Sequence, residues 1–177
     1  MNFDMLASPN FIPYVIFFFL FSSSSSLPTR THTPNTTLIL LCFQVHDGYQ
    51  VGSTIPEETK AASRQVQVLF EDYFVSSQLP YKLNDMIGGS DFLPFIEAFV
   101  PTSGMATGAS GIKSATERDD FHGFANAAFD PCYHLACDTV PNVSQEALRQ
   151  ISQATSTVLE KLSTMSDLRS YLGTASQ

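Results

Sequence analysis

The amino-acid sequence predicts an α/β domain. Strand-like and helix-like segments alternate along the 177 residues, and this order favours helices packed on a sheet over a sandwich of two sheets. Hydrophobic residues make up 44% of the chain and aromatic residues 12%, as is typical of globular proteins. The chain is long enough for one domain with a buried hydrophobic core.

The first predicted element is a short apolar strand, NFDML at residues 2–6, which carries one carboxylate, Asp4. The Ser, Pro and Asn that follow end this strand. A carboxylate among apolar neighbours either faces water at the strand end or needs a cation, a hydrogen-bond network or a metal ion. Ligands of open α/β sheets gather at the carboxyl ends of strands, so Asp4 is a candidate metal ligand.

Residues 15–44 differ in composition from the rest of the chain. They include five consecutive serines and no acidic residue, while all 17 acidic residues lie elsewhere. No strand or helix period would bury this stretch, which favours a foreign insert or a disordered loop. Joining Tyr14 to Val45 gives FIPYVHDGYQVG, which reads as a strand followed by a turn. We therefore assign the domain to residues 1–14 and 45–177.

Two explanations account for this insert. The segment begins with valine, which GT-initial codons encode, and ends with glutamine, which CAG encodes. A pyrimidine-rich tract would also explain its Phe, Ser and Leu residues. These features favour a retained intron in a gene whose assigned start is an internal methionine. A true insertion in a surface loop is the alternative.

Two amphipathic helices are predicted in the remaining chain. The first covers residues 56–78, where a proline and two glutamates suit the first helical turn. The second covers residues 144–163, with Asn142 or Ser144 as its N-cap. The predicted buried residues are Ala62, Val66, Leu69, Phe70, Tyr73 and Phe74 in the first helix, and Leu148, Ile151, Val158, Leu159 and Leu162 in the second.

The chain between these helices is predicted to be less regular. Residues 85–111 are rich in glycine and short apolar runs, and Phe95–Val100 reads as a strand or a short helix. GMATGASG, residues 104–111, reads as a glycine-rich loop, and residues 114–128 read as a long surface loop.

Charge and hydropathy exclude two classes of partner. The net charge is -8, from 9 basic and 17 acidic residues, which argues against nucleic acid. The apolar run Phe11–Phe21 is short and contains Pro13, whereas a membrane-spanning helix needs about 20 apolar residues, so no stable membrane insertion is predicted. The start MNFDML has no basic residue, so we expect no signal peptide in this chain.

The stretch FDPCYHLACDT, residues 129–139, gathers residue types that carry chemistry. Four residues separate Cys132 from Cys137, so a disulfide would close a short loop and would indicate an oxidising compartment. A zinc-binding cysteine pair is the alternative. We favour the disulfide because a structural zinc site usually needs four ligands and the third cysteine lies in residues 15–44.

A histidine in such a loop, here His134, is usually solvated or hydrogen-bonded. A disulfide would order the loop before any metal arrives, which makes His134 a candidate metal ligand. Asp130 and Asp138 flank the loop. They either fix the histidine tautomer, by accepting a hydrogen bond from the ring nitrogen that does not bind the metal, or are plain turn residues.

Four segments together resemble a known family. In chain order they are NFDMLASPNFIPYV, EDYFVSSQLP, GGSDFLPFIEAFVPTSGMATGASGIKS and FDPCYHLACDTVPNVSQEAL. They resemble the C-terminal half of secreted dizinc aminopeptidases, the peptide hydrolases of metallopeptidase family 28. The resemblance covers nearly the whole chain apart from residues 15–44. It implies part of a three-layer α/β/α sandwich with a mixed sheet, without the N-terminal half.

The resemblance implies a zinc-dependent mechanism. Family members hold two zinc ions, bridged by an aspartate and a water, and use a glutamate as general base. By motif, Asp4 corresponds to a ligand of one zinc and His134 to a ligand of the other. Tyr133 corresponds to the tyrosine that stabilises the tetrahedral oxyanion. Cys132 and Cys137 correspond to the short disulfide of the family.

The resemblance also implies a substrate. The GMATG segment, which includes Met105 and Ala106, matches the lining of an apolar pocket that favours leucine-like side chains at the peptide N-terminus. Peptides are therefore the expected substrates, and secretion is expected by resemblance. Asn35 and Asn142 begin N-x-Ser/Thr sequons, and Asn142 is a plausible glycan site in a secreted protein.

The sequence also departs from the family pattern. The remaining zinc ligands and the general-base glutamate are expected upstream of Asn2, so this chain alone is expected to be inactive and to fold poorly. A catalytically inactive, peptidase-like domain is thus the alternative to an aminopeptidase. Gly89 stands where many relatives carry an arginine that reaches the substrate, and glycine removes that contact.

Overall fold

The computed structural model describes residues 1–17, 56–85 and 90–173. The elements in chain order are β1 (Asn2–Phe3), β2 (Tyr14–Phe17), α1 (Glu57–Ser76), β3 (Lys82–Asp85), α2 (Leu93–Glu97), β4 (Gly104–Ala106), β5 (Ile112–Lys113), α3 (Ala115–Phe121), β6 (Ala127–Ala128), a 3-10 helix (Val140–Asn142), α4 (Gln145–Thr164) and α5 (Leu168–Leu172). The predicted α/β class is confirmed.

A four-stranded mixed sheet lies at the centre, in the order β1-β4-β2-β3. β1 is parallel to β4 and β2 is parallel to β3, whereas β2 and β4 are antiparallel. Met105 of β4 lies opposite Phe3 of β1 and Val15 of β2. Met105 and Val15 are fully buried, so the middle of the sheet is part of the core.

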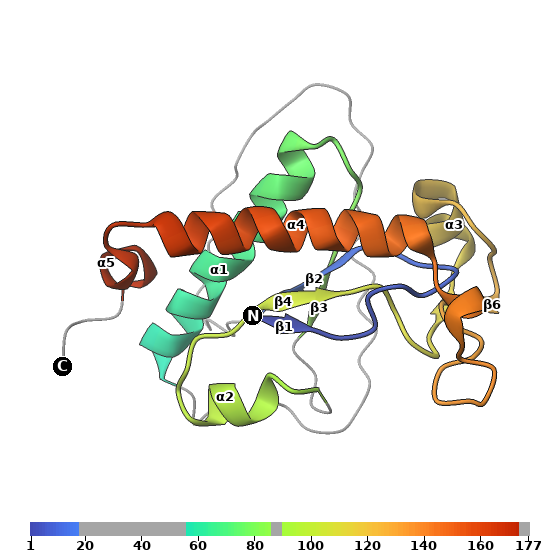
Figure 1. Ribbon diagram of the computed structural model, residues 1–177, viewed down its shortest axis with the longest axis horizontal. Helices are drawn as coiled ribbons and strands as arrows, with labels where there is room; N and C mark the ends of the chain where they lie inside the picture. Colours follow the sequence, from blue (N-terminus) through green and yellow to red (C-terminus); the bar gives the residue numbers. More distant parts are fainter. Residues whose placement is uncertain (18–55, 86–89, 174–177) are drawn as a thin grey trace, which may run out of the picture.

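Helices α1 and α4 cover one face of this sheet (Figure 1). The stripe predicted for the first helix is confirmed, except that Tyr73 is only half-buried. An apolar residue at every third or fourth position places one side of α1 against the sheet and α4. The buried residues of this layer are Val15, Val66, Leu69, Phe70, Phe74, Met105, Ile151, Ala154 and Val158.

The stripe predicted for α4 is partly wrong. Ile151 and Val158 are fully buried, but Leu148 and Leu159 are 42% and 52% exposed. The other buried positions of α4 are two alanines, Ala147 and Ala154, which lie on the same side of the helix as Ile151 and Val158. Small side chains let a helix approach its neighbours closely, and each leucine lies one residue, or about 100°, away from that line. Ser144 is the N-cap, because its Oγ accepts a hydrogen bond from Ala147 N at 3.2 Å.

The opposite face of the sheet is covered by the short helix α2 (Figure 1). Ala106 of β4 packs there against Phe92 and Ile96, and all three are buried. Of the two predictions for Phe95–Val100, the short helix is therefore the better one, although α2 begins earlier, at Leu93. Helices thus lie on both faces of the sheet.

Two predicted loops contain regular structure. GMA, at the start of the predicted glycine-rich loop, forms β4, one of the two inner strands of the sheet. Residues 114–128, predicted as a long surface loop, contain α3 and β6, and β6 pairs with β5. Ser114 and Glu117 form a capping box at the start of α3, with Ser114 Oγ accepting from Glu117 N at 3.1 Å. This signal is legible as Ser-x-x-Glu, but α3 buries no residue and so has no apolar period.

Only three residues of the predicted insert are described. Val15–Phe17 continue β2, and Val15 is fully buried. If residues 15–44 were absent, Val45 would follow Tyr14 and take the place of Val15. Both residues are valine, so a buried valine after Tyr14 fits the chain with the insert and the chain without it. The rest of the insert lies outside the described residues, as do Asn35 and Gly89.

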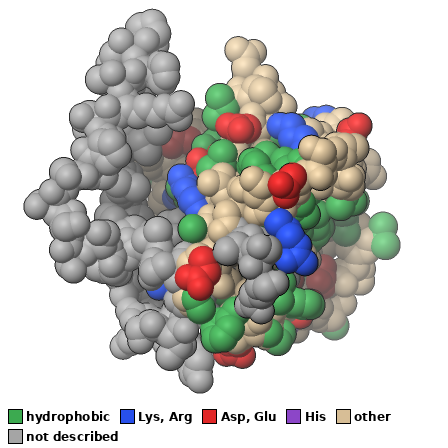
Figure 2. Space-filling model, turned by 90° about the vertical axis from the view of Figure 1, so that its left-hand side faces the viewer, with side chains coloured by type: hydrophobic (Ala, Val, Ile, Leu, Met, Phe, Trp, Pro, Cys, Tyr) green, Lys and Arg blue, Asp and Glu red, His purple; other side chains and the backbone are tan. Residues whose placement is uncertain are grey.

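The surface of the described residues is mixed in character. Figure 2 shows acidic and basic side chains scattered among hydrophobic ones on the face at the α5 end. In the ranges that the structure describes, no helix is both long enough and apolar enough to span a membrane.

Candidate functional site

Asp4 lies directly after β1, at the carboxyl end of the parallel pair of β1 and β4. Its carboxylate is half-buried, and Oδ2 accepts a hydrogen bond from Ser90 Oγ at 2.8 Å. The structure thus places Asp4 at the strand end, where ligands bind in open α/β sheets. The hydrogen bond holds the carboxylate in one orientation without neutralising its charge.

The segment after Asp4 is tied to the end of β4. Met5 has φ 53°, and its carbonyl accepts hydrogen bonds from Thr107 N, at 2.9 Å, and from Thr107 Oγ1. Ser8 N donates to Thr107 Oγ1 at 3.1 Å, and Ser8 Oγ donates to Gly108 O at 2.8 Å. Thr107 is fully buried, so these hydrogen bonds hold the backbone that follows Asp4 against the end of β4.

Cys132 and Cys137 form a disulfide, as the sequence predicted. Tyr133 and His134 lie between them, and their rings stack with centroids 3.9 Å apart. His134 is exposed and has φ 58°, while Tyr133 is half-buried. The loop therefore presents the imidazole to solvent against one face of the tyrosine ring.

Phe129 anchors this loop to the rest of the fold. Its N–H donates to Gly111 O at 2.8 Å, and its carbonyl accepts from Asn10 N at 2.9 Å. Gly108 has φ 107°, and a Cβ there would lie 2.5 Å from the Cβ of Phe129, so only glycine fits. The ring of Tyr14 packs edge-on against that of Phe129, at 5.9 Å between centroids.

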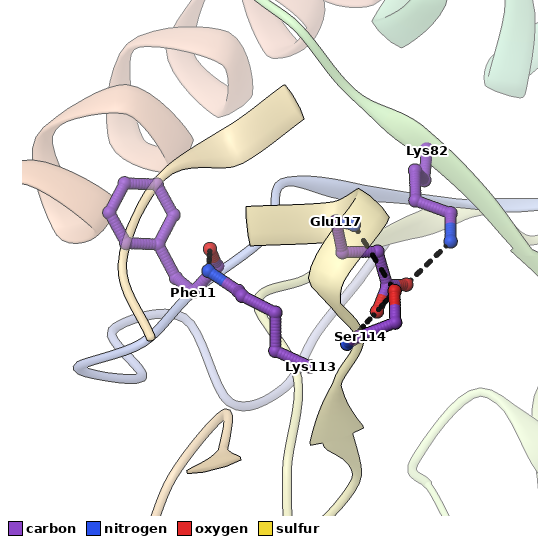
Figure 3. Close-up of polar contacts among 5 residues, drawn as sticks. All are labelled: Phe11, Lys82, Lys113, Ser114 and Glu117. Atoms are coloured by element: carbon purple, nitrogen blue, oxygen red, sulfur yellow. Dashed lines mark hydrogen bonds and ion pairs between the residues drawn. The ribbon is translucent and has the colours of Figure 1, made fainter. Parts of the chain in front are cut away.

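Two polar side chains hold the neighbouring hairpin. Lys113 is 1% exposed, and its Nζ donates to Phe11 O (Figure 3) and to His122 O, each at 2.9 Å. Burial lowers the pKa of Lys113. Asn10 donates to Phe124 O at 2.9 Å and accepts from Phe124 N at 2.9 Å. Neither side chain was predicted to have a role, although both residues stand in segments that carry the family resemblance.

Figure 3 also shows the Glu117 carboxylate between Ser114 and Lys82. Lys82 Nζ lies 2.6 Å from Glu117 Oε1, and Ser114 N donates to Oε2 at 2.8 Å. Burial alone would raise the pKa of Glu117, but the hydrogen bonds from Lys82 and Ser114 outweigh it and lower that pKa. The contact ties β3 to α3.

Met105 and Ala106, predicted to line the substrate pocket, are both buried. Met105 belongs to the core beneath α1 and α4, and Ala106 packs against Phe92 and Ile96 of the α2 layer. Their side chains point to opposite faces, as neighbouring strand residues do. A direct substrate contact from either residue stays a prediction.

Asn142, the predicted glycan site, is half-buried. Its Nδ2 donates to Asp130 Oδ1 at 2.9 Å and to Asp138 Oδ1 at 3.2 Å. The two aspartates that flank the disulfide loop are therefore both bonded to one amide group.

The described residues fit zinc in donor type but not in number. A carboxylate and an imidazole, from Asp4 and His134, are common zinc ligands. Within the described ranges, however, no group of three or more His, Cys, Asp or Glu side chains is gathered around one point. A tetrahedral zinc site needs more ligands than these two, so no catalytic step through zinc follows from this chain by itself.

Comparison with known proteins identifies the family. Peptidase family M28 matches residues 1–159. The chain belongs to Peptidase family M28. The resemblance found in the sequence segments is thereby confirmed, and the M28 assignment accounts for the mixed sheet with helices on both faces.

Several fungal M28 relatives resemble the chain. It is 32% identical over 155 residues to the probable leucine aminopeptidase 2 of Aspergillus oryzae, covering 88% of this chain and 25% of that protein. It is 31% identical over 155 residues to the probable leucine aminopeptidase 2 of Aspergillus fumigatus, with the same coverage. The leucine aminopeptidase 2 of Arthroderma otae is 30% identical over 148 residues, covering 84% and 23%. The chain thus spans about a quarter of the length of these curated relatives.

Proposed function

We propose that this chain is the part of an M28 aminopeptidase that supplies Asp4 and His134 to a dizinc centre. The observation that carries the proposal is the position of Asp4 at the carboxyl end of β1, in a chain that matches Peptidase family M28. Zinc, when bound, would polarise the scissile carbonyl and lower the pKa of a water. Ser90 orients the Asp4 carboxylate, and the Tyr133 hydroxyl donates to the oxygen that becomes negative during peptide hydrolysis.

The proposed substrates are peptides with an apolar N-terminal residue, and the proposed location is outside the cell. The names of the relatives support leucine as the favoured residue. The disulfide supports an oxidising compartment. Met105 and Ala106 shape the apolar pocket from the core side, and residues 15–44 are an insert without a role in catalysis.

A second function has one observation in its favour. The described residues gather no third ligand beside Asp4 or His134, which suits a peptidase-like domain without activity. The same observation suits the first proposal if the remaining ligands belong to another part of the protein. The two functions therefore differ in whether a complete site can form around this chain.

A chimera separates them. The region preceding the matched quarter of the Aspergillus oryzae relative would be joined to this chain, with and without residues 15–44. Hydrolysis of leucine para-nitroanilide and bound zinc would be measured, with circular dichroism to verify folding. We expect a folded, active chimera with two zinc ions, while the chain alone is inert.

Matched variants test the roles of the two ligands. Asp4→Ala and His134→Ala should each lower activity of the chimera by more than about 100-fold, because each removes a metal ligand. Asp119→Ala and His122→Ala are the controls. Asp119 is a surface carboxylate, and His122 shares with His134 an exposed side chain and a positive φ. A folded chimera without bound zinc or activity would favour the inactive domain instead.

A further inference from the structure

Asn142 occupies an unusual position relative to the disulfide loop. Asp130 precedes the loop and Asp138 follows it, and both carboxylates accept hydrogen bonds from the single Nδ2 of Asn142. Asp130 Oδ1 also accepts from Cys132 N at 2.9 Å. The loop is therefore closed twice, by the disulfide within it and by the amide group across its base.

The hydrogen bonds are of the stronger kind. Each joins an amide N–H to a carboxylate oxygen, and a hydrogen bond to a charged acceptor is stronger than one between neutral groups. The Asp130 contact is half-buried and the Asp138 contact is exposed, so the first contributes more. One N–H for each carboxylate uses both hydrogens of the amide nitrogen.

The same nitrogen is the atom that N-glycosylation modifies. Attachment of a sugar replaces one of the two N–H hydrogens by an N–C bond and places a bulky group on the atom between the two aspartates. A nitrogen with one hydrogen cannot donate separately to two carboxylates. A glycan on Asn142 and the closed base of the loop therefore exclude each other.

We propose that Asn142 is a positioning residue, an amide clamp that holds the loop carrying Tyr133 and His134, and that it carries no glycan in the folded protein. This proposal does not depend on zinc binding or on peptidase activity. It assigns the sequon Asn-Val-Ser a role inside the fold: Asn142 is the clamp and Ser144 is the N-cap of α4.

Hydrogen exchange and NMR of the full chain test the clamp. Leu135 N donates to Cys132 O at 2.9 Å and Asp138 N to Leu135 O at 3.0 Å, so both amides report on loop closure. In Asn142→Ala they should exchange about tenfold faster, and the ring protons of His134 should lose the upfield shift caused by the stacked Tyr133 ring. Amides in the middle of α4 report whether the variant remains folded.

Two further variants keep the test decisive. The double variant Asp130→Asn with Asn142→Asp exchanges donor and acceptor across the Asp130 contact only, because a carboxylate at position 142 cannot donate to Asp138. It should therefore bring exchange and the His134 signals part of the way back to wild type, whereas Asn142→Asp alone should not. Thr139→Ala, which removes a 3.4 Å hydrogen bond from Thr139 Oγ1 to Cys137 O at the end of the same loop, should leave both readouts unchanged. Unchanged exchange and His134 signals in folded Asn142→Ala would overturn the clamp.

The glycan is measured on the chain secreted from a eukaryotic host. Mass spectrometry of the peptide that contains Asn142 should find it unmodified, while a synthetic peptide of residues 138–147 accepts a glycan from the same host's transferase. Asp130→Ala with Asp138→Ala should raise the modified fraction. A glycan on Asn142 of the folded wild-type chain, with slow exchange at Leu135, would contradict the proposal.

Discussion

The two sides of this M28 chain are held together by different forces. The face under α1 and α4 is packed by apolar side chains from the sheet and both helices. The region from Gly108 to Asn142 contains only one fully apolar anchor among its buried residues, Phe129, and depends on side chains that bond backbone carbonyls. The first region depends on packed apolar side chains, whereas the second depends on single polar atoms.

The difference explains where the candidate site lies. Apolar burial is not directional, so it fixes the helices without fixing any one side chain to a fraction of an ångström. Hydrogen bonds from Asn10 are directional: its Nδ2 donates to Ala128 O at 3.1 Å and its backbone N donates to Phe129 O at 2.9 Å. These bonds specify the backbone at which the loop with His134 begins. A loop that presents reactive groups needs the second kind of support.

The largest expected effect is in the apolar region. Phe70 is fully buried between α1, the sheet and α4. Phe70→Ala should lower the free energy of unfolding by about 3–5 kcal/mol, because it removes a buried ring and leaves a cavity. Urea denaturation followed by circular dichroism measures this. Val75→Ala, at a side chain that is 66% exposed on the same helix, should change it by about 0.5 kcal/mol or less.

The next largest effect is in the region from Gly108 to Asn142, at the close contact between Gly108 and Phe129. Gly108→Ala should cost about 3 kcal/mol, from a positive φ and from a Cβ 2.5 Å from Phe129. Gly173→Ala is the matched control, because Gly173 also has a positive φ, 68°, but nothing within 4 Å of the added Cβ. It should cost about 1 kcal/mol. Equal losses of stability at the two glycines would show that Phe129 can move away from an added Cβ at little cost in free energy.

The same contrast separates what sequence could predict from what it could not. The stripe of α1 was predicted residue by residue, because an apolar period of three to four positions states which side is buried. The α4 stripe failed at Leu148 and Leu159, since the close approach of Ala147 and Ala154 decides which side faces the core. An apolar period shows which positions are hydrophobic, but it does not show where a small side chain such as alanine lets the helix pack closely against its neighbours.

The candidate site was predicted from motif and not from period. The disulfide and the position of Asp4 at a strand end were predicted because two nearby cysteines and a lone carboxylate are legible in one sequence. The metal-ligand role of Asp4 stays a prediction. Lys113 was missed because its partners, Phe11 O and His122 O, are backbone atoms, and any residue can offer a carbonyl. Asn142 was read as a sequon, because the aspartates it bonds are recognised as its partners only in three dimensions.

Lys113→Met tests a buried polar anchor. The variant keeps the side-chain length but leaves the carbonyls of Phe11 and His122 without their donor, which should cost about 2 kcal/mol. Lys161→Met, at an exposed position near the end of α4, should cost about 0.5 kcal/mol or less. If the two variants were equally stable, water would be replacing the amine, and the contrast between the two regions would weaken.

The pH dependence of this cost has a definite sign. Burial lowers the pKa of Lys113 in the folded chain, so the unfolded chain binds more protons between that lowered value and 10.5. Stability supplied by Lys113 therefore rises with pH across this window. An uncharged amine still has two N–H groups, one for each carbonyl. The deficit of Lys113→Met relative to wild type should widen from pH 7 to pH 10. A deficit that narrows would mean that the two carbonyls and Glu117 stabilise the charged amine in the folded chain and raise its pKa.

The smallest expected effect concerns Glu117, at the edge of the polar region. Its pKa is lowered from 4.5 in the folded chain, so its contribution to stability is present above 4.5 and is lost as pH falls through the folded value. Glu117→Gln should therefore cost about 1 kcal/mol at pH 7 and progressively less below pH 4.5. Urea denaturation of both proteins across this pH range measures the difference. Asp119→Asn on the exposed side of α3 should show no such convergence, because its ion pair with Arg118 is exposed and within one helix. A constant Glu117→Gln deficit at all pH values would mean that the amide loses packing, and that the contacts with Lys82 and Ser114 contribute nothing through charge.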